Sequence, residues 1–311
     1  MSKYYFDIDG KKIFVAGHNG MVGSAVLRKL INEKCKILTT DRSEVDLINQ
    51  FQVIKWFDSN KPDVVILCAA KVGGIQANDK YPVDFLYNNL MIQNNIIHAS
   101  YSTNVKKLIF LGSSCIYPRD CSQPMHEESL LTGQLESTNQ WYAIAKIAGI
   151  KLCQAYRKQY DKDYISAMPT NLYGPGDNYD LYSSHVIPAL LRKCHEAKIS
   201  NNNFMEVWGT GKVKREFLHV DDCAEAIIFL LKHYSQNEHI NVGTGIDITI
   251  EDLTKTIQKV VGYSGDIKFD SSKPDGTPRK LLNTEKINNL GWISKIPLES
   301  GLRSVYEDFI K

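Results

Sequence analysis

A strand that runs into a glycine-rich turn and then a helix constrains the fold of this chain most. The strand is Lys12 to Ala16, the glycines are Gly17, Gly20 and Gly23, and the helix is predicted from Met21 to Glu33. The first two glycines allow a tight turn and close approach to a pyrophosphate, and the third allows close packing of helix on strand. Free N–H groups at the helix start would bind the phosphates. Because the spacing is G-x-x-G-x-x-G, only a βαβ context favours a dinucleotide site over an ordinary turn.

The alternation of short apolar strands and helices continues through the first half of the chain. It predicts strands at Cys35 to Thr39, Val64 to Ala70, Leu108 to Gly112 and Tyr164 to Met168, and a long helix at Gln140 to Tyr160. Short buried strands separated by helices form parallel βαβ units. The predicted fold class is therefore α/β, with a Rossmann-like doubly wound parallel sheet and ligands beyond the carboxyl ends of its strands.

The second half is less regular and predicts a smaller C-terminal α/β domain that holds the substrate. The stretch Asn171 to Asn178 is rich in Gly, Pro and Asn and is expected to end the sheet pattern. Two later segments, Phe217 to Lys232 and Ile240 to Gly245, are expected to return to the first domain. We therefore predict a cofactor domain of residues 1–175 with 217–245, and a substrate domain of residues 176–216 and 246–311.

Charge and cysteine content narrow the functional classes. The formal net charge of +2 gives no support for a nucleic-acid or membrane partner. The first ten residues hold no apolar run that resembles a signal peptide. The seven cysteines are odd in number and form no Cys-x-x-Cys pair, so neither a disulfide framework nor a zinc site is expected. A cytoplasmic location is the better expectation.

A tyrosine and a lysine lie four residues apart on the long predicted helix. Tyr142 and Lys146 would share one helix face, where a cation lowers the pKa of a phenol and lets it exchange protons near neutral pH. Such a pair also occurs by chance, so its context decides. Ser113 follows a predicted central strand and could bind the same substrate oxygen. The order of glycine turn, serine and Tyr/Lys pair favours hydride-transfer chemistry.

The cofactor's adenosine ribose should meet the end of the second strand. An acid at this point binds a free 2′-hydroxyl, and a guanidinium binds a 2′-phosphate. Asp41 and Arg42 stand side by side there, so the sequence leaves NADP and NAD both open. Either residue could instead be a surface-loop charge.

Longer segments carry a resemblance to a known family. They are Ala-Gly-His-Asn-Gly-Met-Val-Gly from 16, Ala-Ala-Lys-Val-Gly-Gly-Ile from 69, Leu-Gly-Ser-Ser-Cys-Ile-Tyr-Pro from 111, Tyr-Ala-Ile-Ala-Lys from 142, Met-Pro-Thr-Asn-Leu-Tyr-Gly-Pro from 168, Ser-His-Val-Ile-Pro from 184, Arg-Glu-Phe-Leu-His-Val-Asp-Asp from 215 and Lys-Pro-Asp-Gly-Thr-Pro-Arg-Lys from 273. The chain resembles the extended short-chain dehydrogenases/reductases. Within them it is similar to the branch that turns GDP-4-keto-6-deoxy-D-mannose into GDP-L-fucose with NADPH, commonly as a homodimer.

The resemblance implies roles by position. Ser113, Tyr142 and Lys146 would be the reductase triad, and Cys115 and His185 the acid/base pair that epimerises carbons 3 and 5. Cofactor contacts would come from Gly17, Asn19, Gly20, Met21, Val22, Gly23, Asp41, Arg42, Ala69, Lys146, Asn171 and His185. The GDP-sugar would be held by Asn171, Lys193, Trp208, Arg215 and Arg279. Two positions depart from the family, since Asn19 and Lys193 stand where a basic residue and an arginine are common.

The second pair has a clear chemical purpose. Protons beside the ketone of a 4-keto sugar are acidic, so a base on one ring face and an acid on the other can invert carbons 3 and 5. Cys115 lies two residues beyond Ser113, and on an extended segment both would face one pocket. A thiolate beside an imidazolium is a competent base. Taken alone, however, Cys115 and His185 are ordinary core residues, and His219 is expected in a packed turn from Arg215 to Asp222.

Three functions stay open on the sequence. The leading one is the bifunctional epimerase and reductase that makes GDP-L-fucose. A related enzyme could act on another GDP-4-keto sugar, such as a 6-deoxy-heptose, or reduce without epimerising. A catalytically idle nucleotide-binding regulator is a third, which the intact Ser113, Tyr142 and Lys146 disfavour. Lys193, Arg215 and Arg279 could be solvated charges, and Trp208 could belong to the core.

Overall fold

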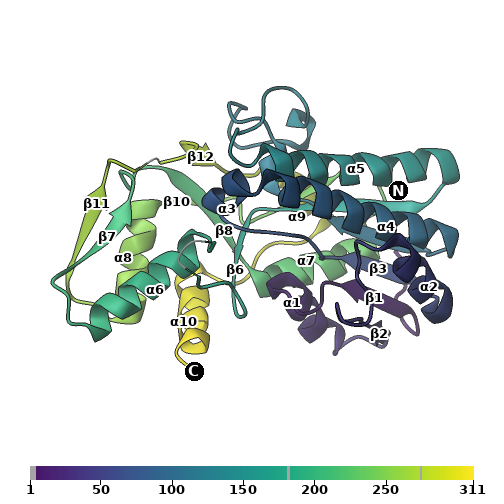
Figure 1. Cartoon of the computed structure of the whole chain (residues 1–311), viewed down its shortest axis with the longest axis horizontal. Helices are drawn as coiled ribbons and strands as arrows, with labels where there is room; N and C mark the ends of the chain where they lie inside the picture. The colour runs from purple at the N-terminus through teal and green to yellow at the C-terminus, as the bar shows by residue number, and fades with distance from the viewer. Residues whose placement is uncertain (1–4, 181–182, 274) are drawn as a thin grey trace.

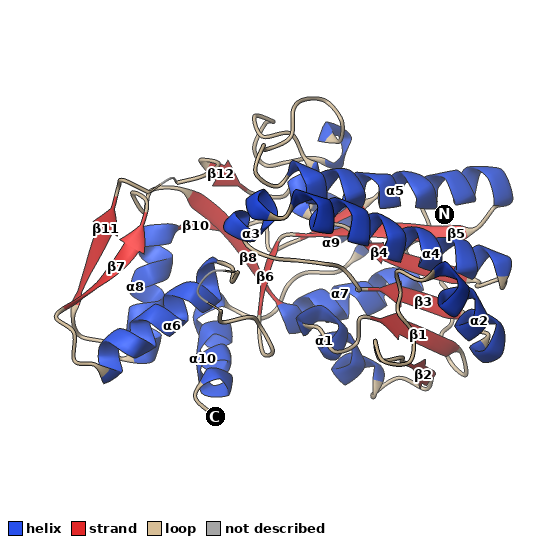
Figure 2. Cartoon of the chain, in the orientation of Figure 1, coloured by secondary structure: helices blue, strands red, loops and turns tan. Residues whose placement is uncertain are grey.

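A six-stranded parallel sheet organises the larger part of the molecule (Figures 1 and 2). The computed structural model describes residues 5–180, 183–273 and 275–311, so of the segments that carry the resemblance only position 274 lies outside it. The strand order is β2-β1-β3-β4-β5-β9. The strands are β1 Lys12–Ala16, β2 Lys36–Leu38, β3 Val64–Leu67, β4 Lys107–Leu111, β5 Asp163–Pro169 and β9 Ile240–Val242. This architecture confirms the predicted Rossmann-like α/β class.

Helices cover both faces of this sheet (Figure 2). They are α1 Met21–Leu30, α2 Gln50–Asn60, α3 Ile75–Lys80, α4 Asn89–Ser102, α5 Gln140–Tyr160, α7 Val220–His233 and α9 Glu285–Leu290. Side chains of successive β1 residues point to opposite faces. Ile13 and Val15 therefore join the core that contains α1 and α7, while Phe14 and Ala16 join the core that contains α2, α4 and α5. Both cores are closed to water, which fixes β1 and its glycine turn.

A smaller α/β part lies at one end of the large sheet (Figure 1). Strand β8 Lys214–His219 is its centre and pairs with β6 Asn171–Tyr173, β10 Asp247–Thr249 and β12 Arg279–Lys280. A separate pair, β7 Phe204–Trp208 and β11 Asp266–Asp270, lies at its outer end. Helices α6 Val186–Ile199, α8 Ile250–Val261 and α10 Leu298–Phe309 complete a third apolar core.

Three short helical turns lie between β3 and α5 along the chain. Residues Asp84–Asn88 form one turn of π-helix, and Ser114–Ile116 and Glu127–Ser129 form 3₁₀ turns. None of the described helices is both long and apolar enough to cross a membrane.

Four sequence expectations need correction in detail. The helix expected to reach Glu33 ends at Leu30, and the strand expected to reach Ala70 ends at Leu67. The stretch Asn171 to Asn178 does leave the large sheet, but its first three residues form β6 beside β8. Residues Arg215 to Asp222 are not a packed turn, because the chain continues from strand β8 directly into α7. For the strands, pairing partners distant in the sequence decide where the element ends.

Candidate functional site

The glycine turn after β1 forms a cradle for a pyrophosphate. Gly17 has φ +84°, and a Cβ there would lie 2.7 Å from the Ala69 backbone. A Cβ on Gly23 would lie 2.1 Å from the carbonyl oxygen of Gly17. Gly20 caps α1 without a side-chain hydrogen bond, so the first N–H groups of the helix, including those of Met21 and Val22, are open to an anion. The turn therefore fits a dinucleotide, with Ala69 against it.

The predicted ribose site holds a fixed carboxylate. Asn19 donates a hydrogen bond from Nδ2 to Oδ1 of Asp41 at 2.8 Å, and Nε2 of His18 lies 3.5 Å from the same oxygen. Arg42 is exposed and has no hydrogen bond or ion pair within the described residues. The structure thus brings Asn19 and Asp41 together across the turn and leaves Arg42 extended into solvent.

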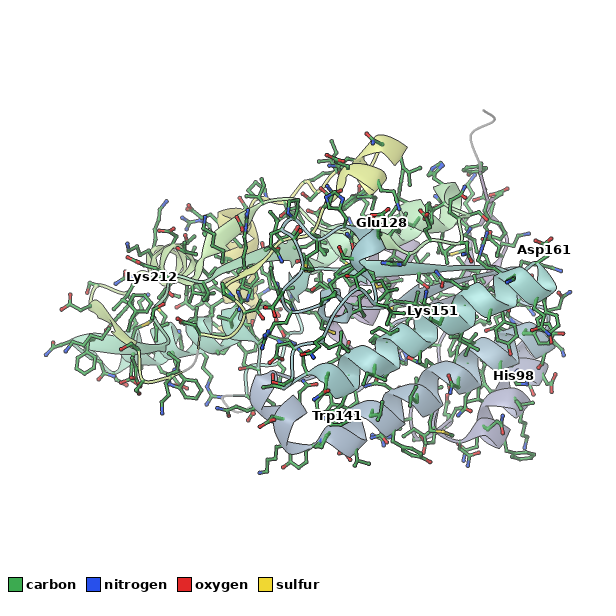
Figure 3. All side chains as sticks on the ribbon, turned by 90° about the horizontal axis from the view of Figure 1, so that it is seen from above. His98, Glu128, Trp141, Lys151, Asp161 and Lys212 are labelled. Atoms are coloured by element: carbon green, nitrogen blue, oxygen red, sulfur yellow. The ribbon has the colours of Figure 1, made fainter. Side chains whose placement is uncertain are left out.

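Tyr142 and Lys146 lie on one face of α5, as their spacing predicts (Figure 3 shows the helix between the labels Trp141 and Asp161). Lys146 is 3% exposed, and its Nζ donates to the carbonyl oxygen of Leu111, the last residue of β4, at 2.8 Å. Nζ also lies 5.6 Å from the centre of the Tyr142 ring. Phe85, from the π-helical turn, packs edge-on against that ring at 6.4 Å. Lys146 is thus hydrogen-bonded to the end of β4, and the Tyr142 ring packs against a buried aromatic side chain.

Burial changes the protonation expected for this pair. Burial raises the pKa of Tyr142 above its ordinary value, and the nearby Cys115 adds to the rise. Burial also lowers the pKa of Lys146 to about 8. The phenol pKa is therefore raised, not lowered as the Tyr/Lys spacing suggested, because desolvation by burial is the largest effect on it. At neutral pH the phenol is a proton donor.

Ser113 and Cys115 lie directly beyond β4, but not on an extended segment. Residues Ser114–Ile116 form a 3₁₀ turn capped by Ser113, whose Oγ accepts the N–H of Cys115 at 3.4 Å. The turn still places the Ser113 side chain beside the Cys115 thiol, and Lys146 is among the charges that lower the pKa of Cys115. Burial is the larger effect and raises the pKa of this thiol. The thiol is therefore protonated at neutral pH.

His185 caps α6, opposite the loop that follows β3. Its pKa is lowered, first by desolvation and then by the positive charge of Lys280. The residues just before it touch the β3 loop, because the N–H of Gly74 donates to the carbonyl oxygen of Ser183 at 2.9 Å. The structure therefore gives a neutral imidazole rather than the imidazolium that the sequence suggested beside a thiolate.

Lys280 is a site residue that the sequence argument missed. Among the charges that act on Cys115 its effect is the largest, and it also lowers the pKa of His185. Strand β12 aligns Lys280 with Arg215 of β8, while Arg279 pairs with Lys214. Because side chains alternate along a strand, Lys280 and Arg279 point to opposite faces. Lys280 is the last residue of the motif that begins at 273, and strand alternation there was the signal that could have identified it.

Four of the predicted substrate residues lie along the smaller part. Nζ of Lys193 lies 5.0 Å from the exposed ring of Trp208, a cation–π contact. Arg215 faces Asp275, which itself accepts the N–H of Thr210 at 2.7 Å. Asn171 donates from Nδ2 to the carbonyl oxygen of Glu216 at 2.8 Å, so this amide braces β6 against β8. Asp275 is a second residue that the sequence argument missed.

Arg279 differs from the other predicted cations. Its Nε donates to the carboxylate of Asp247 on the neighbouring strand β10, with which it forms an ion pair. The guanidinium is therefore partly engaged, and the structure does not join it to Cys115, Tyr142 or His185.

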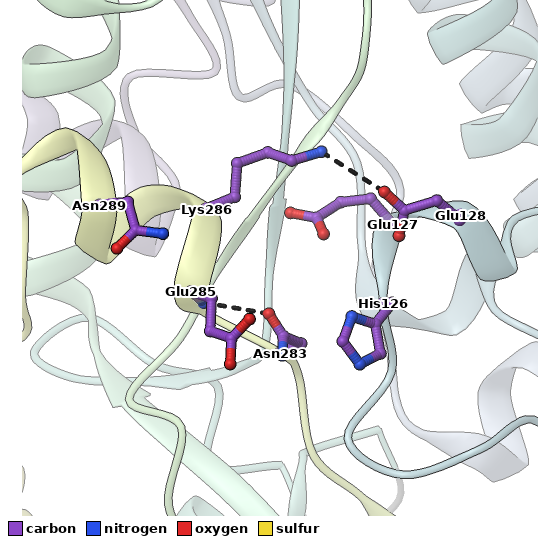
Figure 4. Close-up of a pocket in the computed structure, with 7 residues that line it drawn as sticks. All are labelled: His126, Glu127, Glu128, Asn283, Glu285, Lys286 and Asn289. Carbon is purple, nitrogen blue, oxygen red and sulfur yellow. Dashed lines mark hydrogen bonds and ion pairs between the residues drawn. The ribbon is translucent and has the colours of Figure 1, made fainter.

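A separate cavity of about 330 Å³ lies away from all of these residues (Figure 4). It is lined by His126, Glu127, Glu128, Asn283, Glu285, Lys286 and Asn289. Lys286 lies 3.9 Å from Glu128 there. None of the predicted site residues lines this cavity.

The fold and the site define an enzyme of the short-chain dehydrogenase/reductase class. The defining features are the Rossmann-like sheet, the glycine turn without a side-chain cap, and the Tyr/Lys pair beside a serine. The chain belongs to the NAD dependent epimerase/dehydratase family, whose sequence pattern matches residues 13–243. It is 58% identical to GDP-L-fucose synthase of Sinorhizobium fredii over 97% of this chain and 96% of that one.

Solved structures agree with this family. A GDP-6-OMe-4-keto-L-xylo-heptose reductase from C. jejuni superposes with a TM-score of 0.92 at 38% identity, over 98% of this chain and 99% of that one. A GDP-L-fucose synthetase from Naegleria fowleri bound to NADP superposes with a TM-score of 0.92 at 28% identity, over 100% and 97% of the two chains.

Proposed function

We propose that this protein is a bifunctional enzyme that epimerises carbons 3 and 5 of GDP-4-keto-6-deoxy-D-mannose and reduces carbon 4 with NADPH, giving GDP-L-fucose. The observation that carries the proposal is the grouping of Ser113, Cys115, Tyr142 and Lys146 beyond the end of β4. The charge of Lys280 acts on both Cys115 and His185. Binding alone would not require this set. The 58% identical relative named for this product supports it.

Reduction uses the Tyr142 phenol as the proton donor. NADPH, when bound, supplies the hydride to carbon 4 of the ketone. Tyr142 gives its proton to the carbonyl oxygen, for which its raised pKa is suited. The Ser113 hydroxyl donates a hydrogen bond to the same oxygen, and Lys146 offsets the charge that remains on the phenol oxygen. The hydride and the phenol proton together convert the ketone to an alcohol.

Epimerisation uses Cys115 and His185 as a pair that holds one proton. A base takes the proton from carbon 3 or 5, an enolate forms, and the other member returns a proton to the opposite ring face. Ser113 and Tyr142 stabilise the negative charge on the enolate oxygen. At neutral pH the pair starts as a protonated thiol and a neutral imidazole, because the pKa of Cys115 is raised and that of His185 is lowered. One proton is therefore available from the thiol, and the imidazole can accept one.

Deuterium exchange separates the two activities. Wild-type enzyme and ketosugar in heavy water without NADPH should incorporate deuterium at carbons 3 and 5, followed by mass and NMR. Cys115→Ser should lose this exchange, since a hydroxyl is a far weaker acid than a thiol. With NADPH added, the variant should still slowly make an unepimerised GDP-deoxysugar. Undiminished exchange in Cys115→Ser would remove Cys115 from the mechanism.

A GDP-4-keto-heptose is the alternative substrate, favoured by the 38% identical heptose reductase with a TM-score of 0.92. Room around carbon 6 of the sugar would decide between hexose and heptose. Parallel assays with both ketosugars discriminate them, and a wild type that reduces without exchanging deuterium would be a reductase only.

The assembly and the domain division are parts of the same proposal. We propose a homodimer through the outer faces of α4 and α5, where Trp141 and Ile144 are 36% and 40% exposed one helical turn apart. Light scattering of Ile144→Glu should then report a monomer.

We also propose that residues 1–175 with 217–245 hold the cofactor and that residues 176–216 and 246–311 hold the substrate. A cytoplasmic location, which the odd cysteine count supports, completes the proposal.

A further inference from the structure

A buried carboxylate on β8 joins the two parts of the molecule near the epimerising pair. We propose that Glu216 is a positioning residue, whose carboxylate fixes the chain that carries Lys280 so that this cation faces Cys115 and His185. This role deepens the proposed epimerisation and rests on it only for the reaction that is followed.

The hydrogen bonds of Glu216 are the first observation. Its side chain is fully buried. Oε1 accepts the N–H of Thr244 at 2.6 Å and that of Gly245 at 2.8 Å, both in the loop that follows β9 of the large sheet. Oε2 accepts the N–H of Leu282 at 2.9 Å, two residues beyond the end of β12 in the smaller part. The carboxylate therefore ties the edge of the large sheet to the chain that leaves β12.

Little room is left around this carboxylate. A Cβ on Gly243 would overlap Oε1 and lie 2.9 Å from Cδ of Glu216. The amide of Glu216→Gln has an acceptor on one side only, so its NH₂ group would face backbone N–H groups in either orientation. Only an acceptor on both sides satisfies Thr244, Gly245 and Leu282 together.

The path along the chain from Glu216 to Lys280 is short. Strand β12 ends at Lys280, which pairs with the residue before Glu216. The side chain of Gln123 then accepts the N–H of Leu281 at 2.9 Å. Glu216 accepts the next N–H, that of Leu282. An N–H donor in place of Oε2 would push Leu282 away from β8, and the end of β12 would move with it.

The charges around Lys280 give its position a measurable effect. Burial raises the pKa of Cys115 and lowers that of His185, and the charge of Lys280 lowers both. Charge–charge interactions weaken with distance, so a retreat of Lys280 should raise both pKa values. Loss of the negative charge of Glu216 would by itself lower them, so the two explanations predict opposite signs. The groups that act electrostatically on Lys280 are Cys115, Arg215, Glu136 and Cys121, and Lys146 acts on Cys115 as well.

The pH dependence of Cys115 alkylation tests the proposal without any sugar. Wild type and variants are treated with iodoacetamide across the alkaline range, and modification of the peptide that contains Cys115 is followed by mass spectrometry. Because the thiolate is the reactive form, the midpoint reports the pKa of the thiol. We expect the midpoint of Glu216→Gln to lie at higher pH than that of wild type, as for Lys280→Met. A midpoint that stays in place or moves to lower pH overturns the proposal.

Deuterium exchange at carbons 3 and 5 of the ketosugar gives the second readout. Both limbs of its pH profile should move to higher pH in Glu216→Gln, and the rate at neutral pH should fall about 10- to 100-fold, as a misplacement of about 1 Å predicts. The double variant Glu216→Gln/Lys280→Met should shift no further than Lys280→Met alone, because Glu216 acts through Lys280. Additive shifts would contradict this.

Asp222→Asn is the matched control for a buried carboxylate. Asp222 is 3% exposed, and its Oδ2 accepts the backbone N–H groups of Lys295 and Ile296, both at 2.8 Å. The substitution should lower the urea midpoint of unfolding, as Glu216→Gln does, but move neither the alkylation midpoint nor the exchange profile. Equal shifts in both variants would mean that Glu216 acts through stability alone.

Gly243→Ala covers the case in which Glu216→Gln fails to fold. Gly243 does not have a positive φ, so alanine fits its backbone, and the new Cβ pushes the intact carboxylate from the loop after β9 toward Leu282. The alkylation midpoint should again move to higher pH, and an unmoved midpoint in the folded variant overturns the proposal. A wild type without deuterium exchange would contradict the proposed epimerisation and leave the alkylation results intact, so the two proposals fail separately.

Discussion

Gly74 tests how closely the loop after β3 must approach the segment before His185. Its backbone has φ −67° and ψ 177°, which alanine also adopts, so Gly74→Ala introduces no backbone strain. The added Cβ would, however, lie 2.7 Å from the carbonyl oxygen of Ser184. An ordinary contact begins near 3.4 Å, so the two segments must separate by about 0.7 Å (3.4 − 2.7).

The anchoring of the two segments determines which one moves. Asn89 holds the backbone N–H and carbonyl oxygen of Lys71 at 2.8 and 3.0 Å. Asn78 donates to the carbonyl oxygens of Gly73 and Gly74 at 2.8 and 3.0 Å. The β3 loop is therefore held by four hydrogen bonds from two buried amides. We expect the segment that leads into His185 to move instead.

A shift of this size at an acid/base residue has a large kinetic effect. A misplacement of about 1 Å can cost about 100-fold in rate, so about 0.7 Å predicts a 10- to 100-fold loss of deuterium exchange at carbons 3 and 5. NADP⁺ binding by calorimetry should stay within about threefold of wild type, because the glycine turn and α5 do not move. Val72→Ala is the control, since Val72 is 61% exposed in the same loop. A folded Gly74→Ala enzyme with near wild-type exchange would refute the reasoning.

Four further predictions follow from the site residues and from one buried carboxylate. Tyr142→Phe should lower the rate of reduction, measured as NADPH consumption, by at least about 100-fold, while GDP-sugar binding persists. Deuterium exchange should be fastest between the lowered pKa of His185, below 6.5, and the raised pKa of Cys115, above 9.0. It should fall at acid pH as the imidazole gains a proton and at alkaline pH as the thiol loses one. Lys280→Met should move both limbs to higher pH, because this cation lowers both pKa values. Glu216→Gln should lower the free energy of unfolding by about 2–4 kcal/mol in urea, because its buried carboxylate accepts three backbone N–H groups.

Sequence reasoning was right where the chemistry is local. The glycine turn and the helix Gln140–Tyr160 appear where they were predicted, because glycine spacing and an i,i+4 pair depend on near neighbours. It was wrong about the extended segment through Cys115, which is a 3₁₀ turn, and about Arg215 to Asp222, which is strand then helix. Those segments pack against α5, β6 and α1, which no local pattern reveals.

The sequence by itself determined the class of sheet, the cofactor turn and the residue types available for proton transfer. Only the tertiary structure decided that Lys280, 165 residues beyond Cys115 (280 − 115), acts on its thiol. It also decided that Asn19 fixes Asp41 and that burial reverses the expected pKa of Tyr142. Local patterns fix which groups a chain offers. Desolvation and charge proximity depend on which distant segments pack together, and they set how those groups ionise.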